Sequence, residues 1–548
     1  MRIALLSNIT VDLLADMLKK TFEVYLPSGF DGWQQEILLP TSGLYEFQPE
    51  AVVILLHADA CKEIWNSKKE GEKIIDEWCE VITHFVEKTP GIPVFVSSID
   101  IVNNKCFYGS EERLNLFYES IFIRKIQSLH ETGKRVYILP VKDTITNIGR
   151  NNYYSSKMWY WGSMPYSLKG LAALNDLIVR YVSASKGMKK KCIAVDLDNT
   201  LWGGVIGEEG VDGIVLSENG EGARYKDLQR LLKKIKGQGV LLAILSKNNI
   251  EDVEPVFNHP HMILQREDFV AEMINWEPKC ENIKHLAENL NVGMDAFVFL
   301  DDNPIEREQM KEAWPEVSVV EFPKDSSMLS DSMTKAYEEY FLSLEVTEED
   351  ANKTSMYHAQ EQRENERKQS VSLEEFLKKL DMVMEIHYVA DDEIKRVTQL
   401  VNKTNQFNLT TRRYSEEEIC AFSSSKENDV ITVHLADKYG DQGLVAVIIL
   451  KYEGSNAEID SFLMSCRVMG RSVETEIVSQ LKNGLKKKGI DSLKAVYLKT
   501  NRNSPVKELY ESLGFETVRS DDSRKEYITK VDDLPESTGF FKEVINKL

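Results

Sequence analysis

The predicted fold class is a multidomain α/β protein, and three observations point to it. In residues 1–185, apolar runs of strand length alternate with longer amphipathic stretches, which is typical of a parallel sheet covered by helices. The same alternation starts again at residue 192. The chain has 548 residues, 42% of them hydrophobic, which is enough to fill several cores at roughly 150 residues per domain.

Changes of composition along the chain give the expected domain boundaries. We expect one α/β domain over residues 1–185 and a second over residues 186–344, which begins with a basic linker. Residues 345–375 are mostly charged and favour helix, so we expect a solvent-facing connector helix there. Residues 376–548 change character again and predict a mixed α+β domain.

Each domain has its own expected strands. In the first domain they are Arg2–Ser7, Ala51–Leu56, Pro93–Ser98 and Arg135–Pro140. In the second they are Cys192–Val195, Val240–Leu245, Phe297–Leu300 and Val317–Phe322. In the third, a helical signal up to about residue 402 is followed by strands Ile431–Lys438, Gly443–Tyr452 and Ala457–Ser465, helix Gly470–Lys488, strand Ser492–Lys499 and helix Ser504–Leu513.

The charge balance and the cysteines exclude several functional classes. With 67 Lys and Arg against 88 Asp and Glu, the net charge is −21, which disfavours non-specific binding to nucleic acid or to anionic membranes. No C-x-x-C pair occurs among the seven cysteines, so neither a zinc ribbon nor a disulfide framework is indicated. No segment reaches about 18 consecutive apolar residues. We therefore expect a cytoplasmic protein with no nucleic-acid partner and no membrane span.

Polar residues follow three of the expected strands in the second domain. They are Asp196-Leu197-Asp198-Asn199-Thr200, Ser246-Lys247 and Asp301-Asp302-Asn303. Open α/β sheets bind ligands at the carboxyl ends of their parallel strands, so we expect these residues to meet there. Lys279 comes directly after Pro278, which favours an abrupt helix start.

In this order the four motifs resemble those of the haloacid-dehalogenase (HAD) phosphotransferase superfamily, whose core is a Rossmann-like sheet. The resemblance implies that Asp196 attacks phosphorus and forms an aspartyl-phosphate, and that Asp198 protonates the leaving group and then activates water. It also implies a Mg²⁺ ion bound by Asp196, Asp301, Asp302 and the backbone carbonyl of Asp198. The phosphate-binding residues that it implies are Thr200, Ser246, Lys247 and Lys279. Alternatively, Thr200 has a structural part and orients Asp196 through a hydrogen bond.

The spacing of these motifs predicts an open site. Asp196 and Ser246 are 50 residues apart, and Lys279 and Asp301 are 22 residues apart. Neither interval has room for a cap domain in addition to its helix and strand. We therefore expect a capless core that admits a bulky substrate or takes its lid from another domain of the chain.

The residues around the motifs are similar to those of the FkbH-like branch of the superfamily. The likeness is carried by Trp202-Gly203-Gly204 after the first motif, by Ser246-Lys247-Asn248-Asn249, and by Asp301-Asp302-Asn303-Pro304-Ile305-Glu306-Arg307. Gly203 and Gly204 allow a tight reversal of the chain beside the site. Trp202 either walls the site or packs in the core.

In the last domain, the loop Arg467-Val468-Met469-Gly470-Arg471-Ser472 lies between an expected strand and an expected helix, and the N–H groups at the start of that helix can hold a pyrophosphate. This loop fits the pattern Q/R-x-x-G-x-G/A of the GNAT-like acyltransferases except at Ser472, and the domain resembles that family. The resemblance implies that Asn503 and Tyr510 contact coenzyme A or a phosphopantetheine arm. Cys466 is either an acyl carrier or a buried packing cysteine. Asn402–Arg413, which also resembles FkbH-like proteins, either lines a phosphate or pantetheine pocket or is a capped turn.

The first domain resembles the SGNH-hydrolase-like fold, which is of flavodoxin type. Ser7 follows the first strand, at the position of the usual nucleophile, but the local sequence is Leu-Leu-Ser-Asn rather than Gly-Asp-Ser. A late D-x-x-H motif is missing, because the next histidine after His130 is His259 in the second domain. Without that base Ser7 has no evident activator, so we predict a non-catalytic binding or docking domain.

Three functions fit these motifs. The FkbH-like resemblance implies a phosphatase coupled to transfer of a glyceryl group from an acyl phosphate, such as 1,3-bisphosphoglycerate, to an enzyme thiol and then to the phosphopantetheine arm of an acyl carrier protein. The second is a phosphatase joined to an acetyl-CoA-dependent N-acetyltransferase that acts on a phosphorylated sugar. The third is a phosphatase with non-catalytic docking domains. In all three the cofactor is Mg²⁺ and the substrate is a phosphorylated small molecule.

Overall fold

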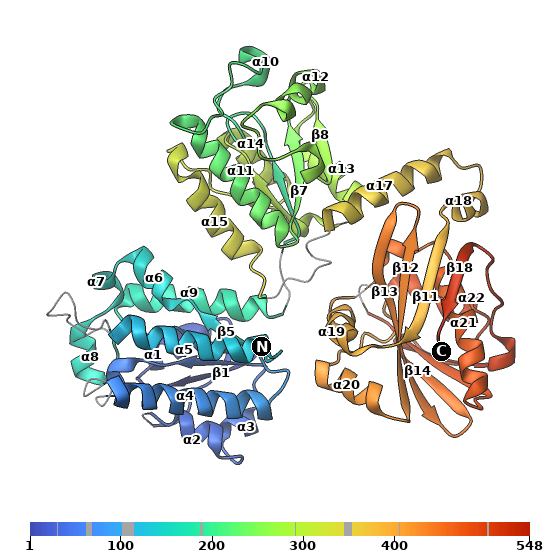
Figure 1. The fold of residues 1–548 in the computed structure, drawn as a ribbon, viewed down its shortest axis with the longest axis horizontal. Helices are drawn as coiled ribbons and strands as arrows, with labels where there is room; N and C mark the ends of the chain where they lie inside the picture. Colours follow the sequence, from blue (N-terminus) through green and yellow to red (C-terminus); the bar gives the residue numbers. More distant parts are fainter. Residues whose placement is uncertain are drawn as a thin grey trace. The chain divides into compact units, whose positions relative to one another are not determined.

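The computed structural model describes residues 1–29, 31–61, 68–100, 114–186, 190–290, 292–344, 353–404, 406–500 and 503–548. The chain divides into two compact units, one of Met1–Lys190 with Asp331–Val346 and the other of Lys191–Ser330 with Thr347–Leu548. The described residues form three sheets, two of them parallel and the third mixed (Figure 1). This arrangement confirms the predicted multidomain α/β class.

The N-terminal unit is built on a parallel sheet with the strand order β2-β1-β3-β4-β5. Its strands are β1 (Arg2–Ser7), β2 (Glu23–Tyr25), β3 (Ala51–Leu55), β4 (Val94–Ser97) and β5 (Val136–Leu139). The four expected strands are therefore confirmed. The sequence does not predict β2, because this strand has only three residues and none of them is fully buried.

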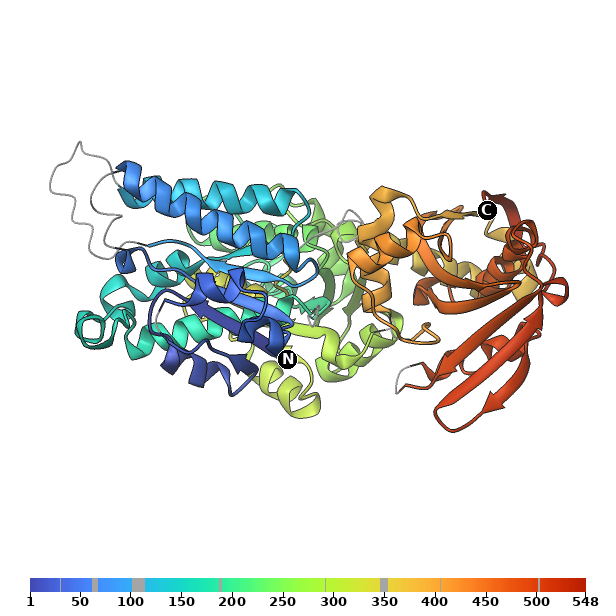
Figure 2. The ribbon, with the colours of Figure 1, turned by 90° about the horizontal axis from the view of Figure 1, so that it is seen from below.

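Helices cover both faces of this sheet, which is why β3 and β4 are buried along their whole length. Helices α1 (Asp12–Leu18) and α9 (Leu168–Ala184) pack on one face. Helices α4 (Lys68–Lys88) and α5 (Leu114–Glu131) lie side by side on the other (Figure 2). The shorter helices are α2 (Trp33–Leu38), α3 (Gly43–Phe47), α6 (Val141–Ile148), α7 (Arg150–Tyr153) and α8 (Ser156–Gly162).

The substitution Gly170→Ala is expected to destabilise this unit. Gly170 is buried in α9, and a Cβ atom there would lie 2.2 Å from the backbone carbonyl oxygen of Tyr153. A backbone atom cannot swing aside, so the helix must shift, at a typical cost of about 1–3 kcal/mol. Chemical unfolding measures the loss. Gly162→Ala is the control, because a Cβ atom there meets nothing within 4 Å; equal stability of the two variants would contradict the packing.

The middle sheet is also parallel, with the order β10-β9-β6-β7-β8. Its strands are β6 (Cys192–Val195), β7 (Leu241–Ser246), β8 (Ala271–Ile274), β9 (Phe297–Leu300) and β10 (Ser318–Val319). β6 and β9 have the predicted bounds, β7 is shifted by one residue, and the expected strand Val317–Phe322 is shortened to two residues. The sequence does not predict β8, because this edge strand is only half-buried and lacks a continuous apolar run.

Helices connect the strands of the middle sheet. The longer ones are α11 (Glu221–Gly237), α13 (Lys279–Leu290) and α14 (Pro304–Ala313), and two short ones are α10 (Ile206–Glu209) and α12 (Ile250–Val253). Buried side chains of α13 pack with the strands in one core that includes Phe297 and Phe299. The following helix, α15 (Leu329–Tyr340), begins at the boundary between the two units.

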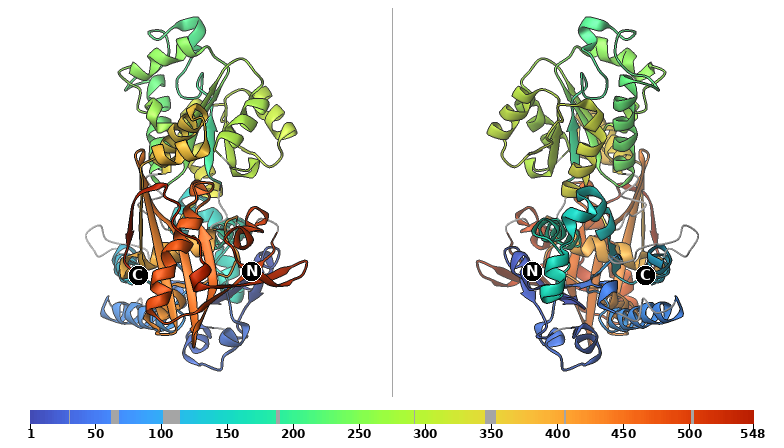
Figure 3. Two further views of the ribbon diagram at one scale, coloured as in Figure 1. Left: turned by 90° about the vertical axis from the view of Figure 1, so that its right-hand side faces the viewer. Right: turned by 90° about the vertical axis from the view of Figure 1, so that its left-hand side faces the viewer.

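The C-terminal sheet, drawn in orange and red in Figure 3, is mixed. Its strand order is β16-β17-β15-β14-β13-β12-β11-β18. Its strands are β11 (Met382–Tyr388), β12 (Asn428–Asp437), β13 (Gly440–Glu453), β14 (Asn456–Met464), β15 (Ser492–Leu498), β16 (Glu516–Ser520), β17 (Arg524–Lys530) and β18 (Phe541–Asn546). Pairs β14–β15 and β11–β18 are parallel, and the other pairs are antiparallel. Helix α21 (Val473–Lys487) packs on one face, and α19 (Ile394–Lys403) and α20 (Glu416–Ser424) pack on the other.

The helical prediction up to about residue 402 is wrong for β11. Residues Met382–Tyr388 alternate between buried and half-buried, which is the period of a strand with one face on the core. Its two methionines favour helix and hide that signal.

The expected helix Gly470–Lys488 begins only at Val473, because Gly470 and Ser472 have left-handed backbone with φ of 74° and 58°. The expected helix Ser504–Leu513 is split into η9 (Ser504–Val506) and α22 (Leu509–Ser512).

A helix forms in the expected connector, although residues 345–352 lie outside the described part of the chain. Helices α17 (Lys353–Gln369) and α18 (Leu373–Lys379) cover the rest. α17 is not solvent-facing all round: Arg363 is buried, and its guanidinium donates two hydrogen bonds to the carboxylate of Asp437 at 2.6 and 2.7 Å. None of the helices in the described residues combines the length and the apolar character that crossing a bilayer requires.

Candidate active site

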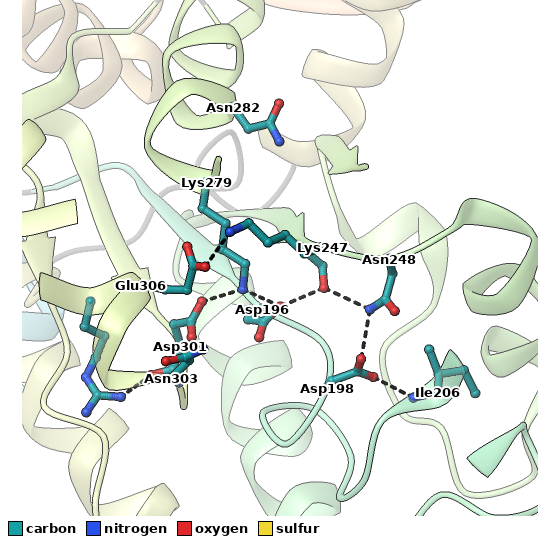
Figure 4. A network of polar contacts seen from close by, with 12 residues as sticks. Asp196, Asp198, Ile206, Lys247, Asn248, Lys279, Asn282, Asp301, Asn303 and Glu306 are labelled. Atoms are coloured by element: carbon teal, nitrogen blue, oxygen red, sulfur yellow. Dashed lines mark hydrogen bonds and ion pairs between the residues drawn. The ribbon is translucent and has the colours of Figure 1, made fainter. Parts of the chain in front are cut away.

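The polar residues that follow β6, β7 and β9 lie together at one edge of the middle sheet (Figure 4). β6 pairs in parallel with β7 on one side and β9 on the other, so Asp196, Ser246 and Asp301 are neighbours at the carboxyl ends of the strands. Lys279 is the first residue of α13 and reaches the same place from above the sheet edge. The sheet topology therefore brings Asp196, Ser246 and Asp301 to one point, and the start of α13 adds Lys279.

Lys279 lies between two buried carboxylates. Its Nζ is 2.9 Å from Oδ1 of Asp196 and 2.6 Å from Oδ2 of Asp301, and Ser246 Oγ donates a hydrogen bond to the same Asp196 oxygen at 2.7 Å. Burial lowers the pKa of Lys279, but the two carboxylates outweigh it and hold the pKa above its ordinary value. Lys279 is therefore a fixed positive charge beside Asp196.

Asp196, Asp301 and Asp302 form a cluster that fits a hard divalent cation. One carboxylate oxygen of each lies within 4.8 Å of the others. Burial, followed by repulsion from Asp196, raises the pKa of Asp301 to about 7 and that of Asp302 to about 6. A single ammonium group does not neutralise three carboxylates, and Mg²⁺ prefers oxygen ligands of this kind. The donor set therefore suits Mg²⁺.

The loop after β9 is held by hydrogen bonds that the sequence analysis did not assign. Asp301 Oδ1 accepts from the backbone N–H of Asn303 at 2.8 Å, and the Asn303 side chain caps α14 by accepting from the N–H of Ile305 at 2.9 Å. Arg307 donates to the backbone carbonyls of Asp301 and Asp302 at 2.8 and 2.6 Å. These contacts fix both carboxylates relative to the sheet.

Asp198 points away from the cation cluster into a set of hydrogen-bond donors. Its Oδ1 accepts from Trp202 Nε1 at 2.9 Å and from the N–H of Ile206 at 3.1 Å, and its Oδ2 accepts from Asn248 Nδ2 at 3.1 Å. Burial raises the pKa of Asp198 in spite of these bonds, which lower it. No role for Asn248 was predicted from the sequence, although its place two residues after Ser246 is a signal.

Trp202 is fully buried, which agrees with the core-packing alternative, and its indole N–H also donates to Asp198, a contact that was not predicted. Its position depends on a reversal of the chain in which Asn199 and Gly204 have φ of 53° and 92°. The N–H of Gly204 donates to Asn199 Oδ1 at 2.9 Å, and Gly203 pairs with Val215. The region after Asp198 is thus a short folded-back loop beside the site.

Two of the predicted phosphate-binding residues have other surroundings. Thr200 is fully buried, and its Oγ1 has no hydrogen-bond partner, so the expected bond to Asp196 is not made. Lys247 pairs at 2.6 Å with Glu306, a residue of the third quoted motif for which this pairing was not predicted. The alternation of side chains at the end of β7 places Ser246 toward Asp196 and the following Lys247 toward α14.

The two arginines of the expected cofactor loop contact helix α17. Arg467 Nη1 lies 2.5 Å from the sulfur of Met356. Arg471 is buried and donates to Gln360 Oε1 at 2.7 Å and to Asp437 Oδ2 at 3.3 Å. In this structure both guanidinium groups are thus engaged by the protein itself.

The remaining residues of that loop precede α21. Gly470 is exposed, and Ser472 is the N-cap of α21 but makes no side-chain capping bond. The side chain of Cys466 lies outside the described residues. Asn503 is fully buried and donates to the backbone carbonyls of Leu498 and Asn408 at 2.8 and 3.0 Å. Tyr510 is buried against Phe515 and Tyr527, and its hydroxyl has no hydrogen-bond partner.

Residues Phe407–Leu409 fill the gap between β14 and β15. These two strands pair with each other only over Asn456–Ile459 and Ser492–Ala495. Beyond that point Phe407–Leu409 forms backbone hydrogen bonds with Phe462 and Met464 of β14 and with Leu498 of β15. The centre of the stretch Asn402–Arg413 is therefore an inserted, buried segment, and not the capped surface turn that was one of the two expectations.

In the N-terminal unit, Ser7 interacts with backbone groups. Its Oγ donates to the carbonyl of Leu55 at 2.7 Å and accepts from the N–H of Ile9 at 3.2 Å. His57, which the sequence analysis did not consider, is buried with its Nδ1 3.6 Å from Asp59. Burial lowers the pKa of His57.

Solved structures similar to this chain include one with a phosphatase domain. It is the N-terminal part of the protein BF1531 from Bacteroides fragilis, which contains a phosphatase domain complexed with Mg; it is 26% identical, covers 61% of this chain and 92% of that chain, and has a TM-score of 0.57. No protein-family model matches the sequence, and no curated protein matches it.

Other similar structures are acetyltransferases. The GNAT domain of S. lividans PAT is 14% identical, covers 26% of this chain and 89% of that chain, and has a TM-score of 0.22. The PaiA N-acetyltransferase from Thermoplasma acidophilum in complex with coenzyme A is 16% identical, covers 27% and 98%, and has a TM-score of 0.21.

Proposed function

We propose that the protein is a Mg²⁺-dependent phosphatase of the HAD type in which Asp196 is the nucleophile. The observation that carries the proposal is the contact of Lys279 with both Asp196 and Asp301 inside a cluster of three carboxylates. Such a site places a nucleophile (Asp196), a fixed positive charge (Lys279) and three carboxylates that can bind a divalent ion next to one another. The phosphatase domain complexed with Mg in the similar Bacteroides protein agrees with this chemistry.

The proposed reaction has two displacements at phosphorus. An oxygen of Asp196 attacks phosphorus, the bond to the leaving oxygen breaks, and that oxygen takes the proton of Asp198. A water molecule then attacks phosphorus, Asp198 takes its proton, and the bond between phosphorus and Asp196 breaks. Inorganic phosphate leaves, and both aspartates return to their starting forms.

The surroundings of each residue suit its proposed part. The raised pKa of Asp198 favours a carboxyl that can carry a proton, and Trp202 and Asn248 fix its direction. Ser246 and Lys279 would hold the phosphoryl oxygens. Asp196, Asp301 and Asp302, with the backbone carbonyl of Asp198, would hold Mg²⁺, which when bound screens the repulsion between an anionic nucleophile and an anionic phosphate.

A phosphate-release screen over acyl phosphates and sugar phosphates tests this proposal. Release is expected to stop when a chelator removes Mg²⁺ and to return when Mg²⁺ is added back. Undiminished release in the presence of the chelator would reject the metal-dependent mechanism. The class of the best substrate also separates an acyl-phosphate enzyme from a sugar phosphatase.

Mg²⁺ binding is expected to weaken as the pH falls from about 8 to 5. The pKa values of Asp301 and Asp302 are raised to about 7 and about 6, so protons occupy these carboxyls below those values and compete with the ion. Because the folded pKa values exceed the unfolded ones, the metal-free protein loses stability as the pH rises through that range. The increase in melting temperature on adding Mg²⁺ should therefore be larger at pH 8 than at pH 5. An increase that is larger at pH 5 would contradict this.

We extend the proposal to the organisation of the chain. The core over residues 186–344 would be capless, because the interval between Asp196 and Ser246 holds the folded-back loop, α10, α11 and strand β7 but no further domain. Residues 1–185 would be a non-catalytic SGNH-like domain, residues 345–375 the connector, and residues 376–548 a GNAT-like domain. The FkbH-like branch is the family that this combination would place the protein in.

A second proposed activity is acyl transfer by the C-terminal domain. Loop 467–472 would hold a phosphate of the donor at the start of the 15-residue helix α21, and Cys466 would carry the acyl group. The acceptor would be the phosphopantetheine arm of an acyl carrier protein. The inserted segment Phe407–Leu409 takes up the edges of β14 and β15 beyond their pairing, so these edges are not open to a pantetheine arm of either kind.

Intact-protein mass measurement separates these alternatives. Incubation with an acyl phosphate should add one acyl group to the parent and none to Cys466→Ala. Binding of acetyl-CoA without acylation of the thiol would favour the N-acetyltransferase alternative. If neither is observed while phosphate is still released, the terminal domains act only in docking.

A further inference from the structure

Two histidines and a glutamate come together on the C-terminal sheet, far from the carboxylate cluster in sequence. His387 is on β11, His434 is on β12, and Glu393 ends the 3₁₀ turn η7 (Asp391–Glu393) that leads into α19. In the antiparallel pairing, His387 is opposite Thr432 and Glu385 is opposite His434. The two histidines are therefore diagonal neighbours on one face of the sheet, with ring centroids 5.5 Å apart.

The hydrogen bonds around His387 leave its Nε2 facing the glutamate. Nδ1 of His387 lies 2.9 Å from the carbonyl oxygen of Tyr388. A carbonyl oxygen can only accept, so Nδ1 carries a ring hydrogen, and in the neutral ring the lone pair is then on Nε2. That Nε2 is 3.6 Å from Glu393 Oε1, which is too long for a hydrogen bond. A histidine that donates from one nitrogen to a backbone carbonyl is oriented as metal-ligating histidines are.

We propose that His387, Glu393 and His434 bind a divalent transition-metal ion such as Zn²⁺. One ligand atom from each of the three lies within 4.8 Å of the others. Two ligands of a tetrahedral zinc ion, each about 2.0–2.2 Å from the metal, are roughly 3.3–3.6 Å apart. The 3.6 Å between His387 and Glu393 fits this spacing, and the 2.6 Å between His434 Nε2 and Glu393 Oε1 needs to open by less than about 1 Å.

The donor set selects the class of metal. Imidazole nitrogens suit Zn²⁺, Ni²⁺ and Cu²⁺, whereas Mg²⁺ prefers oxygen ligands only. The three side chains are 15–34% exposed, so an ion can enter from solvent and keep a water molecule as a further ligand. Glu385 and Asp441 act electrostatically on His434 as acidic neighbours, and Lys547 pairs with Glu385. The surroundings of the three ligands are thus acidic, which favours a cation.

The side chain of Glu393 is held in place by a hydrogen bond from a buried threonine. Thr432 Oγ1, which is fully buried, donates to Glu393 Oε2 at 3.2 Å and leaves Oε1 toward the histidines. Binding would join β11, β12 and the start of α19, which are separated by up to 47 residues along the chain. A bound ion should therefore raise the melting temperature of the protein.

Calorimetric titration of the full-length protein with Zn²⁺ tests the proposal, using a chain without added histidines and with excess Mg²⁺ to occupy the carboxylate cluster. One Zn²⁺ per chain is expected to bind, and His387→Ala and His434→Ala should each weaken binding by at least about 10-fold, the lower end of what losing even an outer partner of a metal ligand costs. His285→Ala is the matched control, because this exposed histidine also has a glutamate near it, Glu288 at 3.6 Å.

Melting temperatures measured with and without Zn²⁺ keep the test valid if a variant is less stable, because each variant is compared with itself. Zn²⁺ should raise the melting temperature of the parent and of His285→Ala, but not that of the double variant His387→Ala/His434→Ala. Unchanged Zn²⁺ affinity in that double variant, or no Zn²⁺ binding by the parent, would overturn the proposal. Asp302→Asn should leave Zn²⁺ binding intact, so failure here is distinct from failure of the phosphatase proposal.

Discussion

Asp196→Asn is expected to give a folded protein that releases phosphate at least about 10⁴-fold more slowly than the parent. Asparagine has the same shape, so Ser246 and Lys279 keep a neighbour of the same size. An amide oxygen is a poor nucleophile, however, and the amide removes one of the three anionic ligands that would hold Mg²⁺. Both effects slow the attack of residue 196 on phosphorus.

A steady-state phosphate assay with an unfolding measurement on the same samples checks this result. Asp227→Asn is the control, since Asp227 is an exposed carboxylate on α11 of the same sheet domain. It should keep the activity of the parent. Retained turnover in Asp196→Asn would remove Asp196 from the mechanism, whatever the cause of the remaining activity.

Lys279→Met is expected to lose both stability and activity. The ammonium group of Lys279 is buried between Asp196 and Asp301, and removing it leaves two buried carboxylates without their positive partner. Breaking a buried ion pair by removing one partner costs about 3–5 kcal/mol. Loss of one group that stabilises the charge of the transition state typically costs about 10²- to 10³-fold in rate.

Chemical unfolding at two pH values measures the stability effect. The loss should be smaller at pH 5 than at pH 8, because a proton then neutralises Asp301, whose pKa is already raised to about 7. Lys284→Met on the same helix is the control, as Lys284 is exposed. A variant as stable and active as the parent at pH 8 would show that Lys279 is not needed to offset the negative charges of Asp196 and Asp301.

Much of the fold could be predicted because buried strands leave a strong pattern. β6 and β9 have no exposed residues and appear in the sequence as unbroken apolar runs. β8 could not be found in this way, because its four residues are only half-buried. β11 alternates in burial but contains methionines that favour helix. The helix propensity of its residues therefore conflicts with its position as a strand in the sheet.

The candidate site could be predicted where the sheet topology alone determines it. Asp196, Ser246 and Asp301 each follow a strand, and parallel strands bring such residues together. The hydrogen bond from Trp202 to Asp198 depends on the backbone of Asn199 and Gly204, which no periodicity reveals. The pairing of Lys247 with Glu306 likewise depends on the direction of one side chain at a strand end.

The cluster of His387, Glu393 and His434 shows a second limit. Its members meet because β11 and β12 pair in one particular register. A shift of that register by one residue would place His434 on the opposite face of the sheet. Since the sequence did not predict β11 at all, it could not predict this cluster.

Reductive trapping of the phosphoenzyme tests the central claim most directly, which is that Asp196 becomes covalently phosphorylated. Borohydride added during turnover with Mg²⁺ reduces an aspartyl-phosphate to homoserine, and peptide mass spectrometry locates the changed residue. Homoserine at position 196 in the parent, and its absence in Asp196→Asn, is the predicted result. Steady turnover with no homoserine at position 196, or with homoserine at another aspartate, would contradict it.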